Sequence, residues 1–403
     1  MTRRIGPATI ILCGCAITLL TLGPRATMGL FLQPMSQSHH WGRDVFALAI
    51  AIQNILWGVG QPLAGAFADR FGVVQSVAIG ALAYAGGLVL MAHASTPGLL
   101  NLSAGVLIGL GLSGASFSIV LSAFGKLLPI EWRSFGYGAA TSAGSFGQFL
   151  FSPLAVALLA DYGWYTTLLS FGAMMLLVIP LSLSLGFHEA PADGNEPVFR
   201  TQSFSSILWE AFRHPSYLML VVGFFTCGFQ VAFITTHLPP DLLDKGLDAA
   251  WGGWVIGLLG LFNILGALCA GWLSDLFPKH HLLSLIYLFR TLTLLGFLIV
   301  PISPASALVF AAVMGLLWLS TVPPTSALVA LMFGVRYMAT LFGFAWFFHQ
   351  VGAFLGVWLG GLIYERYGSY DAVWWLSVLL GLLATLVNLP IIEKPAERLL
   401  IVK

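Results

Sequence analysis

Two arginines lie inside long apolar stretches of this chain. Arg25 lies in GPRATMGLFLQPM, with no other charge between Arg4 and Arg43, and Arg290 lies in SLIYLFRTLTLL. If such stretches cross a bilayer, a guanidinium at the centre costs about 2.5–3.5 kcal/mol on insertion scales and normally faces a bundle interior or a wet cavity. Its planar fork of donors matches a carboxylate. Arg25 is therefore predicted to bind a ligand through a carboxylate.

Structural interpretations of both arginines remain open. Arg25 can instead reach towards the membrane surface or bind backbone carbonyls. Arg290 can be tied to helix-end carbonyls or to Tyr287, an interpretation at least as well supported as substrate binding.

Histidines and amides on the same kind of stretch are further candidates. A histidine side chain in general titrates near neutral pH and can donate to a carboxylate, so His237 or His349 is a candidate to bind substrate or carry a coupled proton. A buried histidine is more often a neutral packing residue. Amide side chains in apolar stretches either line a cavity or hydrogen-bond between helices. Those assigned to the cavity are Asn54, Asn263 and Gln350.

Composition predicts that transmembrane helices position these residues. The chain of 403 residues is 58% hydrophobic and 8% charged, where a soluble domain carries roughly 25% charged residues. Apolar runs of about 20 residues, enough to cross a hydrocarbon core of roughly 30 Å, recur along the chain. The net charge of +1 gives no indication of a nucleic-acid partner. The four cysteines lack disulfide or metal-binding spacing and are predicted to pack as small hydrophobes, and no cofactor is expected.

Polar breaks divide the apolar runs into two sets of six predicted spans. The spans cover residues 6–36, 44–68, 74–94, 98–128, 134–159, 165–187, 215–240, 250–274, 281–301, 304–331, 338–363 and 371–391. The longest polar stretch separates the sets. The prediction is an all-α integral membrane protein with an N-terminal six-helix bundle (1–187), a cytoplasmic linker (188–214) and a C-terminal six-helix bundle (215–403).

The basic residues predict the orientation. Of the 17 Lys and Arg residues, only Arg43, Lys245 and Arg366 fall on the side opposite the termini, apart from the two within spans. Positively charged loops stay in the cytoplasm, so both termini and the linker are predicted to be cytoplasmic. The residues on that side are Arg3, Arg4, Arg70, Lys126, Arg133, Arg200, Arg213, Lys279, Arg336, Lys394, Arg398 and Lys403.

The two halves repeat one another. AGAFADRF, after the second span, matches AGWLSDLF, after the eighth, at an offset of 206 residues. Parallel six-helix repeats are typical of transporters in which two bundles enclose the substrate path around a pseudo-twofold axis.

The repeated loops are predicted to act as conformational latches. In GAFADRFG, Gly65 allows close helix approach, Asp69 can accept from a neighbouring helix N-terminus and Arg70 can pair across the loop. The second copy keeps Gly271 and Asp275 but has Leu276 in place of the arginine, so a weaker latch is expected there.

With its duplicated GAFADRFG-type loop, the chain resembles the major facilitator superfamily. Over nearly its full length it is similar to monocarboxylate porters and bacterial oxalate/formate antiporters. The stretches that carry the similarity are GPRATMGLFLQPM, EWRSFGYGAATSAGSFGQ, HLPPDLLDKGL and FFHQVGAFLGVWLGG. Members of these groups commonly carry a basic residue at the position of Arg25, where it is implicated in anion binding.

The chain departs from these groups at two sites. Animal-type monocarboxylate porters place an Asp and an Arg one turn apart in the eighth span, where this chain has Asn263 and Ala267. The oxalate exchangers have a lysine in the eleventh span, where His349 stands here.

The resemblance implies a secondary transporter of small organic anions, most of all monocarboxylates, often coupled to protons. We expect a monomer in a bacterial cytoplasmic (inner) membrane, with the lipid bilayer and a carboxylate as partners. Two alternatives stay open: a multidrug or hydrophobic-compound exporter of the same fold, and a non-transporting membrane sensor. A membrane enzyme is not expected, because the sequence shows no convergent acid/base pair or metal set.

Overall fold

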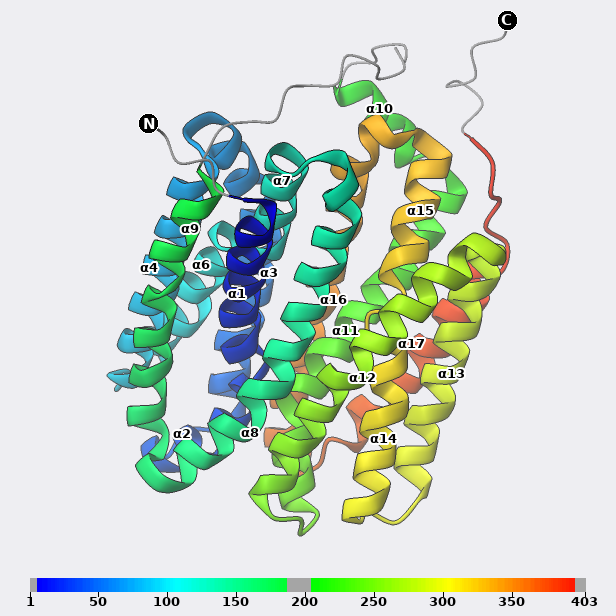
Figure 1. The fold of residues 1–403 in the computed structure, drawn as a ribbon. Helices are drawn as coiled ribbons and strands as arrows, with labels where there is room; N and C mark the ends of the chain where they lie inside the picture. Colours follow the sequence, from blue (N-terminus) through cyan, green and yellow to red (C-terminus); the bar gives the residue numbers. More distant parts are fainter. Residues whose placement is uncertain (1–5, 187–203, 396–403) are drawn as a thin grey trace, which may run out of the picture.

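A computed structural model of the chain describes residues 6–186 and 204–395. This described part is helical throughout, with the helices running roughly side by side (Figure 1). Apolar side chains and a shortage of charge favour this arrangement, since a helix satisfies its own backbone hydrogen bonds inside a bilayer.

Residues 6–186, the described part of the first half, contain nine α-helices. Several predicted spans are built from more than one of them, because the helix is interrupted within the span. In chain order the elements are α1 (Pro7–Ala26), α2 (Met28–His39), α3 (Arg43–Phe71), α4 (Val73–Ala92), α5 (Pro97–Leu100), the π-helix η1 (Asn101–Leu107), α6 (Ile108–Gly114), α7 (Phe117–Leu127), α8 (Ile130–Leu176), α9 (Val178–Ser182) and the 3₁₀ turn η2 (Leu183–Leu185).

The second half has fewer interruptions within its spans, with one between Leu317 and Val322. A short helix, α10 (Phe204–Ala211), precedes it and lies within the predicted linker, whose residues 188–203 fall outside the described part. The remaining elements are α11 (Pro215–Asp244), α12 (Ala249–Leu276), α13 (Lys279–Ile299), α14 (Pro304–Leu317), α15 (Val322–Phe333), α16 (Val335–Tyr367) and α17 (Asp371–Asn388).

The helices confirm the predicted membrane fold. Eleven helical stretches among the described residues are long and apolar enough to cross a membrane. One of them, Glu131–Leu185, is about twice the necessary length because it contains two predicted spans. The chain reverses between these spans at Gly163, whose φ of 74° and ψ of 172° are not helical. Glycine adopts such a positive φ without the steric cost of a Cβ atom.

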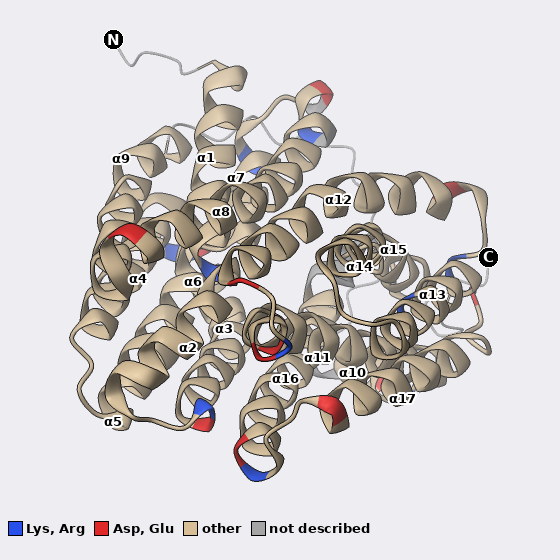
Figure 2. Ribbon diagram, turned by 90° about the horizontal axis from the view of Figure 1, so that it is seen from below, with Lys and Arg blue, Asp and Glu red and all other residues tan. Residues whose placement is uncertain are grey.

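Helix ends define two sides of the molecule. We call the side where α1, α4 and α11 begin the terminus side, which is uppermost in Figure 1, and the opposite side the far side. Seen from the far side, the charged residues lie mostly near helix ends and loops (Figure 2).

The halves meet along three helix pairs: α3 with α16, α8 with α12, and α2 with α11. Glycines allow the close approach. A Cβ atom on Gly361 would meet Ala47 and Asp44, one on Gly58 would lie 2.8 Å from Gln350 Cβ, and one on Gly260 would lie 2.7 Å from the Ser145 carbonyl. Small residues of this kind drive helix association in membranes by letting backbones pack closely.

Candidate functional site

A break in the first membrane span positions Arg25. Helix α1 ends at Ala26, directly after Pro24 and Arg25, and α2 begins at Met28. Thr27 stabilises the break, because its backbone N–H and its hydroxyl both donate to the Pro24 carbonyl, at 3.1 Å and 2.8 Å. Broken helices at this depth commonly line binding sites in transporters.

The Arg25 guanidinium is buried with a neutral partner. Its Nη2 donates to Asn54 Oδ1 at 2.7 Å, whereas its Nε has no hydrogen-bond partner. Among the ion pairs of the described residues, none includes Arg25. The structure thus brings together two of the predicted site residues, and it leaves this cation without a protein carboxylate.

Tyr84 completes the surroundings of Arg25. It lies on α4, is fully buried, and is close enough to interact electrostatically with the guanidinium. Its hydroxyl has no hydrogen-bond partner. An unpaired buried hydroxyl is costly, so this corner of the bundle has donors in excess of acceptors.

Aromatic rings connect this region to the second half. Trp57 on α3 meets Trp346 on α16 edge-on, with ring centroids 5.9 Å apart. The Trp346 ring is stacked on His349, at 4.8 Å and an interplanar angle of 6°. Gln350 packs against Gly58, one turn along α3 from Asn54, and its Nε2 has no partner. His349 and Gln350 therefore lie where α16 meets α3.

Arg290 lies in a different place from Arg25. It is fully buried within the second half, and its Nη1 donates to Cys227 Sγ at 3.2 Å. The Nε and Nη2 of Arg290 have no partner. The structure groups Arg290 with Cys227 and not with Arg25 or Asn54.

His237 and Asn263 make defined structural contacts. His237 Nε2 lies 2.8 Å from the Val357 carbonyl, and the ring packs against Tyr370 and Gly360. Asn263 donates to Ser145 Oγ at 2.9 Å and accepts from the backbone N–H of Leu319 at 3.0 Å. These bonds hold α12 against α8 and against the break after α14, so both residues fit the helix-packing interpretation.

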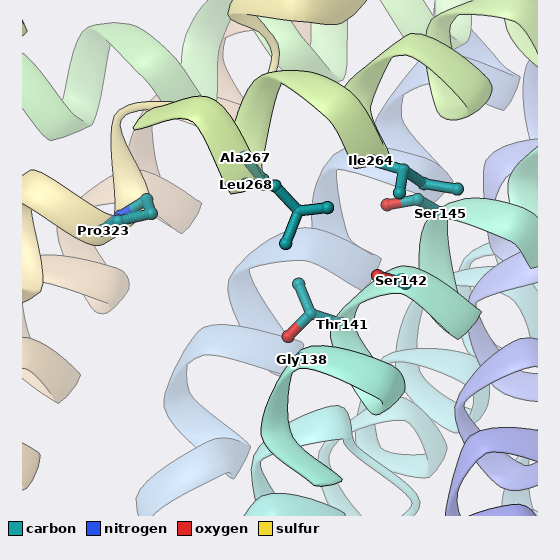
Figure 3. Close-up of a pocket in the computed structure, with 8 residues that line it drawn as sticks. All are labelled: Gly138, Thr141, Ser142, Ser145, Ile264, Ala267, Leu268 and Pro323. Carbon is teal, nitrogen blue, oxygen red and sulfur yellow. The ribbon is translucent and has the colours of Figure 1, made fainter. Parts of the chain in front are cut away.

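A pocket opens between the halves on the terminus side of Asn263 (Figure 3). Its volume is about 170 Å³. Thr141 of α8 faces Leu268 of α12 across it, and Ser145 links it to Asn263. Arg25 does not line this pocket, so the cavity and the buried cation are separate features. The lining residues are Gly138, Thr141, Ser142, Ser145, Ile264, Ala267, Leu268 and Pro323.

The far side is closed by a cluster around Arg43. Its Nη1 and Nη2 donate to the two carboxylate oxygens of Asp244, at 2.6 Å and 2.7 Å, and its Nη1 also donates to Tyr370 Oη at 3.1 Å. The backbone N–H of Arg43 donates to Glu365 Oε1 at 2.6 Å, and the guanidinium covers the Tyr364 ring. A bidentate pair with a carboxylate is the strongest form of this interaction. Burial raises the pKa of Tyr370 and outweighs the nearby Arg43 charge, which lowers it, so this phenol stays neutral.

The latch residues differ in part from expectation. Asp69 pairs with Lys126 Nζ at 2.7 Å rather than with a helix N-terminus. The Arg70 guanidinium lies over its neighbour Phe71, 5.2 Å from the ring centroid, and within the described part of the chain it makes no ion pair across the loop. A Cβ atom on Gly65 or Gly271 would meet nothing within 4 Å, and Asp275 is exposed. The expected close approach at these two glycines is therefore absent from this structure.

Three residues of these clusters escaped the sequence-based assignment. Tyr84 carries no charge and lies in an apolar run, Cys227 was assigned as a small hydrophobe, and Arg43 was counted only as a loop charge. The internal repeat offers a signal for Tyr84, because the offset of 206 residues aligns it with the candidate residue Arg290 of the second half.

Comparison with known proteins identifies transporters that are similar to this chain over most of its length. The chain is 28% identical over 378 residues to the uncharacterized MFS-type transporter YcxA of Bacillus subtilis. The matched region covers 92% of this chain and 91% of that protein. It is 26% identical over 339 residues to monocarboxylate transporter 13 of Bos taurus, covering 81% of this chain and 75% of the relative.

Solved structures show the same fold at low sequence identity. The xylose transporter XylE from E. coli, in an inward open conformation, superposes with a TM-score of 0.74 at 16% identity and covers 96% of each chain. Residues 12–357 match the Major Facilitator Superfamily. This chain therefore belongs to the Major Facilitator Superfamily and is a secondary transporter rather than an enzyme.

Proposed function

We propose that this protein transports a small organic anion, most of all a monocarboxylate, and that Arg25 binds its carboxylate. The observation that carries the proposal is the buried Arg25 guanidinium, whose one described side-chain partner is the neutral Asn54. A buried cation without a counter-ion is costly. A substrate carboxylate supplies the missing charge.

The surrounding groups support the same ligand chemistry. The Arg25 Nε and the Tyr84 hydroxyl are donors without partners, and both are buried. Helices α1 and α2 are separated at Thr27, two residues after Arg25, and breaks of this kind commonly lie at the binding sites of transporters. The similarity to monocarboxylate transporter 13 points to the same class of substrate.

The distribution of contacts supports alternating access as the mechanism. The halves are joined on the far side by Arg43 and are separated by a pocket on the terminus side. With both termini in the cytoplasm of a bacterial inner membrane, as the positive charges indicate, this is an inward-facing state. Residues 1–187 and 215–403 would then rock about the bound anion as two bundles.

Thermal unfolding of the purified protein tests the proposal. The probes are a panel of mono- and dicarboxylates, aromatic acids and uncharged drugs, applied to the parent chain and to Arg25→Gln. A ligand that binds the folded state stabilises it by mass action, by about 2.7 kcal/mol at 100 times Kd. We expect a narrow group of monocarboxylates to raise the melting temperature of the parent and not of Arg25→Gln.

Two controls make the result specific to the charge at this position. Arg25→Lys keeps the positive charge but lacks the planar guanidinium that binds a carboxylate through two donors, so it should retain weak stabilisation by the same acids. Arg366→Gln removes an exposed arginine near the far end of α16 and should respond as the parent does. Equal stabilisation of the parent and Arg25→Gln would refute the anchor, and a response only to uncharged drugs would favour an exporter of hydrophobic compounds.

A further inference from the structure

We propose that Cys227 is a buried thiolate that neutralises Arg290 and takes up a proton through His349, which makes this cluster the coupling site of the transporter. The proton-coupling part rests on the proposed anion transport. The thiolate–guanidinium pair does not depend on it and is tested separately below.

Donors converge on the Cys227 sulfur. Arg290 Nη1 donates to it at 3.2 Å, and the Thr321 hydroxyl donates to it at 3.4 Å. The contact in which the sulfur could itself donate, to the Trp318 carbonyl, is long at 3.9 Å. A neutral thiol is a weak acceptor, whereas a thiolate beside an arginine is strongly favoured. The geometry therefore suits a sulfur anion.

The charge of Arg290 requires such an anion. The residue is fully buried, and its Nε and Nη2 have no partner. No Asp or Glu pairs with it among the described residues. A buried charge without compensation costs several kcal/mol. Cys227 provides the compensation from within the protein, and no cavity is needed at this position.

His349 is placed to exchange the proton. Its backbone packs against Gly228, the residue after Cys227, and its ring is close enough to interact electrostatically with the sulfur. Neither ring nitrogen has a hydrogen-bond partner, although the residue is only 4% exposed. The ring stacks on Trp346, which contacts Trp57 of the first half. His349 therefore lies between the buried Cys227–Arg290 pair and the interface between the two bundles.

The other helices around Cys227 contribute little charge. Helix α13 presents Arg290 and Tyr287, and the Tyr287 hydroxyl already donates to the Gly223 carbonyl at 2.6 Å. Helix α16 presents His349. Within the described residues, α2, α12, α15 and α17 bring no charged or titratable side chain to the sulfur. Protonation of this one atom therefore dominates the charge of the cluster.

The proton step balances without any redox chemistry. The neutral imidazole of His349 takes one proton from a solvent hydronium ion and passes it to the Cys227 thiolate, which gives a neutral imidazole and a neutral thiol, and on release the same proton returns to solvent through His349. Uptake of one proton raises the cluster charge by one. A carboxylate that moves with this proton adds an equal negative charge, so the loaded transporter carries no net extra charge through the membrane.

Ultraviolet absorbance of the thiolate tests the charge state directly. The full-length protein is prepared with Cys13→Ser, Cys15→Ser and Cys269→Ser, so that Cys227 is the remaining cysteine. About 1% of an ordinary thiol is ionised at pH 6.5. We expect a thiolate signal on the order of fifty times larger from this protein, and its loss in the same background with Arg290→Gln. An absorbance step only at ordinary thiol pH would overturn the proposal.

Stability of charge-balanced variants gives a second test if Arg290→Gln does not fold. Cys227→Ala should lower the melting temperature because it leaves Arg290 unpaired. Cys227→Asp keeps an anion, and Cys227→Ala combined with Arg290→Gln removes both charges, so both should recover stability. If Cys227→Ala is as stable as the parent and Cys227→Asp is not, the cysteine is a packing residue and the pair does not exist.

Flux in liposomes separates the coupling role from the proposed substrate. A carboxylate that stabilises the protein is followed together with internal pH, in the parent and in Cys227→Asp. We expect proton movement with the acid in the parent and a shifted pH profile in Cys227→Asp. An unchanged profile would refute coupling at Cys227. If a thiolate is present but no carboxylate is bound or moved, the proposed function fails and the ion pair stands.

Discussion

At the residue level, the buried donors around Arg25 outnumber the acceptors. Arg25 and Tyr84 have donor atoms without partners, while Asn54 is satisfied through Arg25 and the Ile50 carbonyl. Such imbalance normally destabilises a fold. It is retained at functional sites because the ligand supplies the missing acceptors.

Tyr84→Phe tests this interpretation of the imbalance. Removing a buried hydroxyl that has no partner should leave thermal stability unchanged or slightly higher, because no hydrogen bond is lost. Carboxylate affinity should fall by roughly tenfold, equivalent to about 1.4 kcal/mol. Both quantities come from melting curves at increasing carboxylate concentration.

Tyr287→Phe is the matched control. Its hydroxyl donates to the Gly223 carbonyl at 2.6 Å, so this change should lower stability by about 1 kcal/mol and leave carboxylate affinity as in the parent. If Tyr84→Phe behaves like Tyr287→Phe, the Tyr84 hydroxyl is a structural group.

At the level of elements, the far side is held by the ends of α3, α11 and α16. Arg43 begins α3, Asp244 ends α11 and Glu365 lies in the last turn of α16, so one arginine joins two helices of the second half to the first. The pair is largely shielded, with side-chain exposures of 11% and 28%, and is therefore stronger than a fully exposed ion pair. These contacts must separate for the far side to open.

Asp244→Asn should shift the protein towards opening on the far side. The substitution removes the charge of the bidentate partner while keeping its size, so the closed state loses its main interhelix ion pair. Spin labels at the exposed residues Ser95 and Ala305, on the far side of different halves, report the change. We expect the distribution of their separation to gain a longer component.

Glu393→Gln provides the control for this experiment. It removes the charge of a carboxylate that pairs with His280 Nδ1 at 2.7 Å, within the second half on the terminus side. The separation between the far-side labels should match the parent. A longer component in Glu393→Gln, or none in Asp244→Asn, would contradict the assignment of Arg43 and Asp244 as the far-side closure.

At the level of the whole molecule, transport requires the terminus-side pocket to close as the far side opens. Helices α8 and α12 pack closely at Gly253 and Gly260 and diverge towards the pocket lined by Ser142 and Leu268. Because packed interfaces are bistable rather than continuously deformable, the two bundles are expected to move as units.

Ser142→Trp should block this closure. An indole in the pocket between α8 and α12 prevents the terminus side from closing. Because transport requires this conformational step, flux of the stabilising carboxylate should fall by at least about tenfold. Binding measured by thermal unfolding should remain, since the site around Arg25 is separate from the pocket. Flux is measured in liposomes.

Thr166→Trp places the same side chain at an exposed position in the other part of α8. Flux through this control should equal that of the parent. Equal flux through Ser142→Trp and Thr166→Trp would show that the pocket does not close during transport.

Much of this protein was predictable from its sequence alone. Hydropathy, the distribution of Lys and Arg, and the repeat of AGAFADRF as AGWLSDLF led to the helical membrane fold, because a bilayer allows few alternatives for long apolar segments. The same reasoning identified Arg25 and Arg290, since a charge in an apolar run is conspicuous wherever the helix lies.

Only the tertiary structure decided which side chains meet. It paired Arg25 with Asn54, separated Arg290 from them, and placed Cys227 beside that second arginine. It also joined Arg43 to Asp244 across 201 residues of sequence. Helix rotation and register determine such contacts, and both depend on the packing of neighbouring helices, which periodicity within a uniformly apolar span does not reveal.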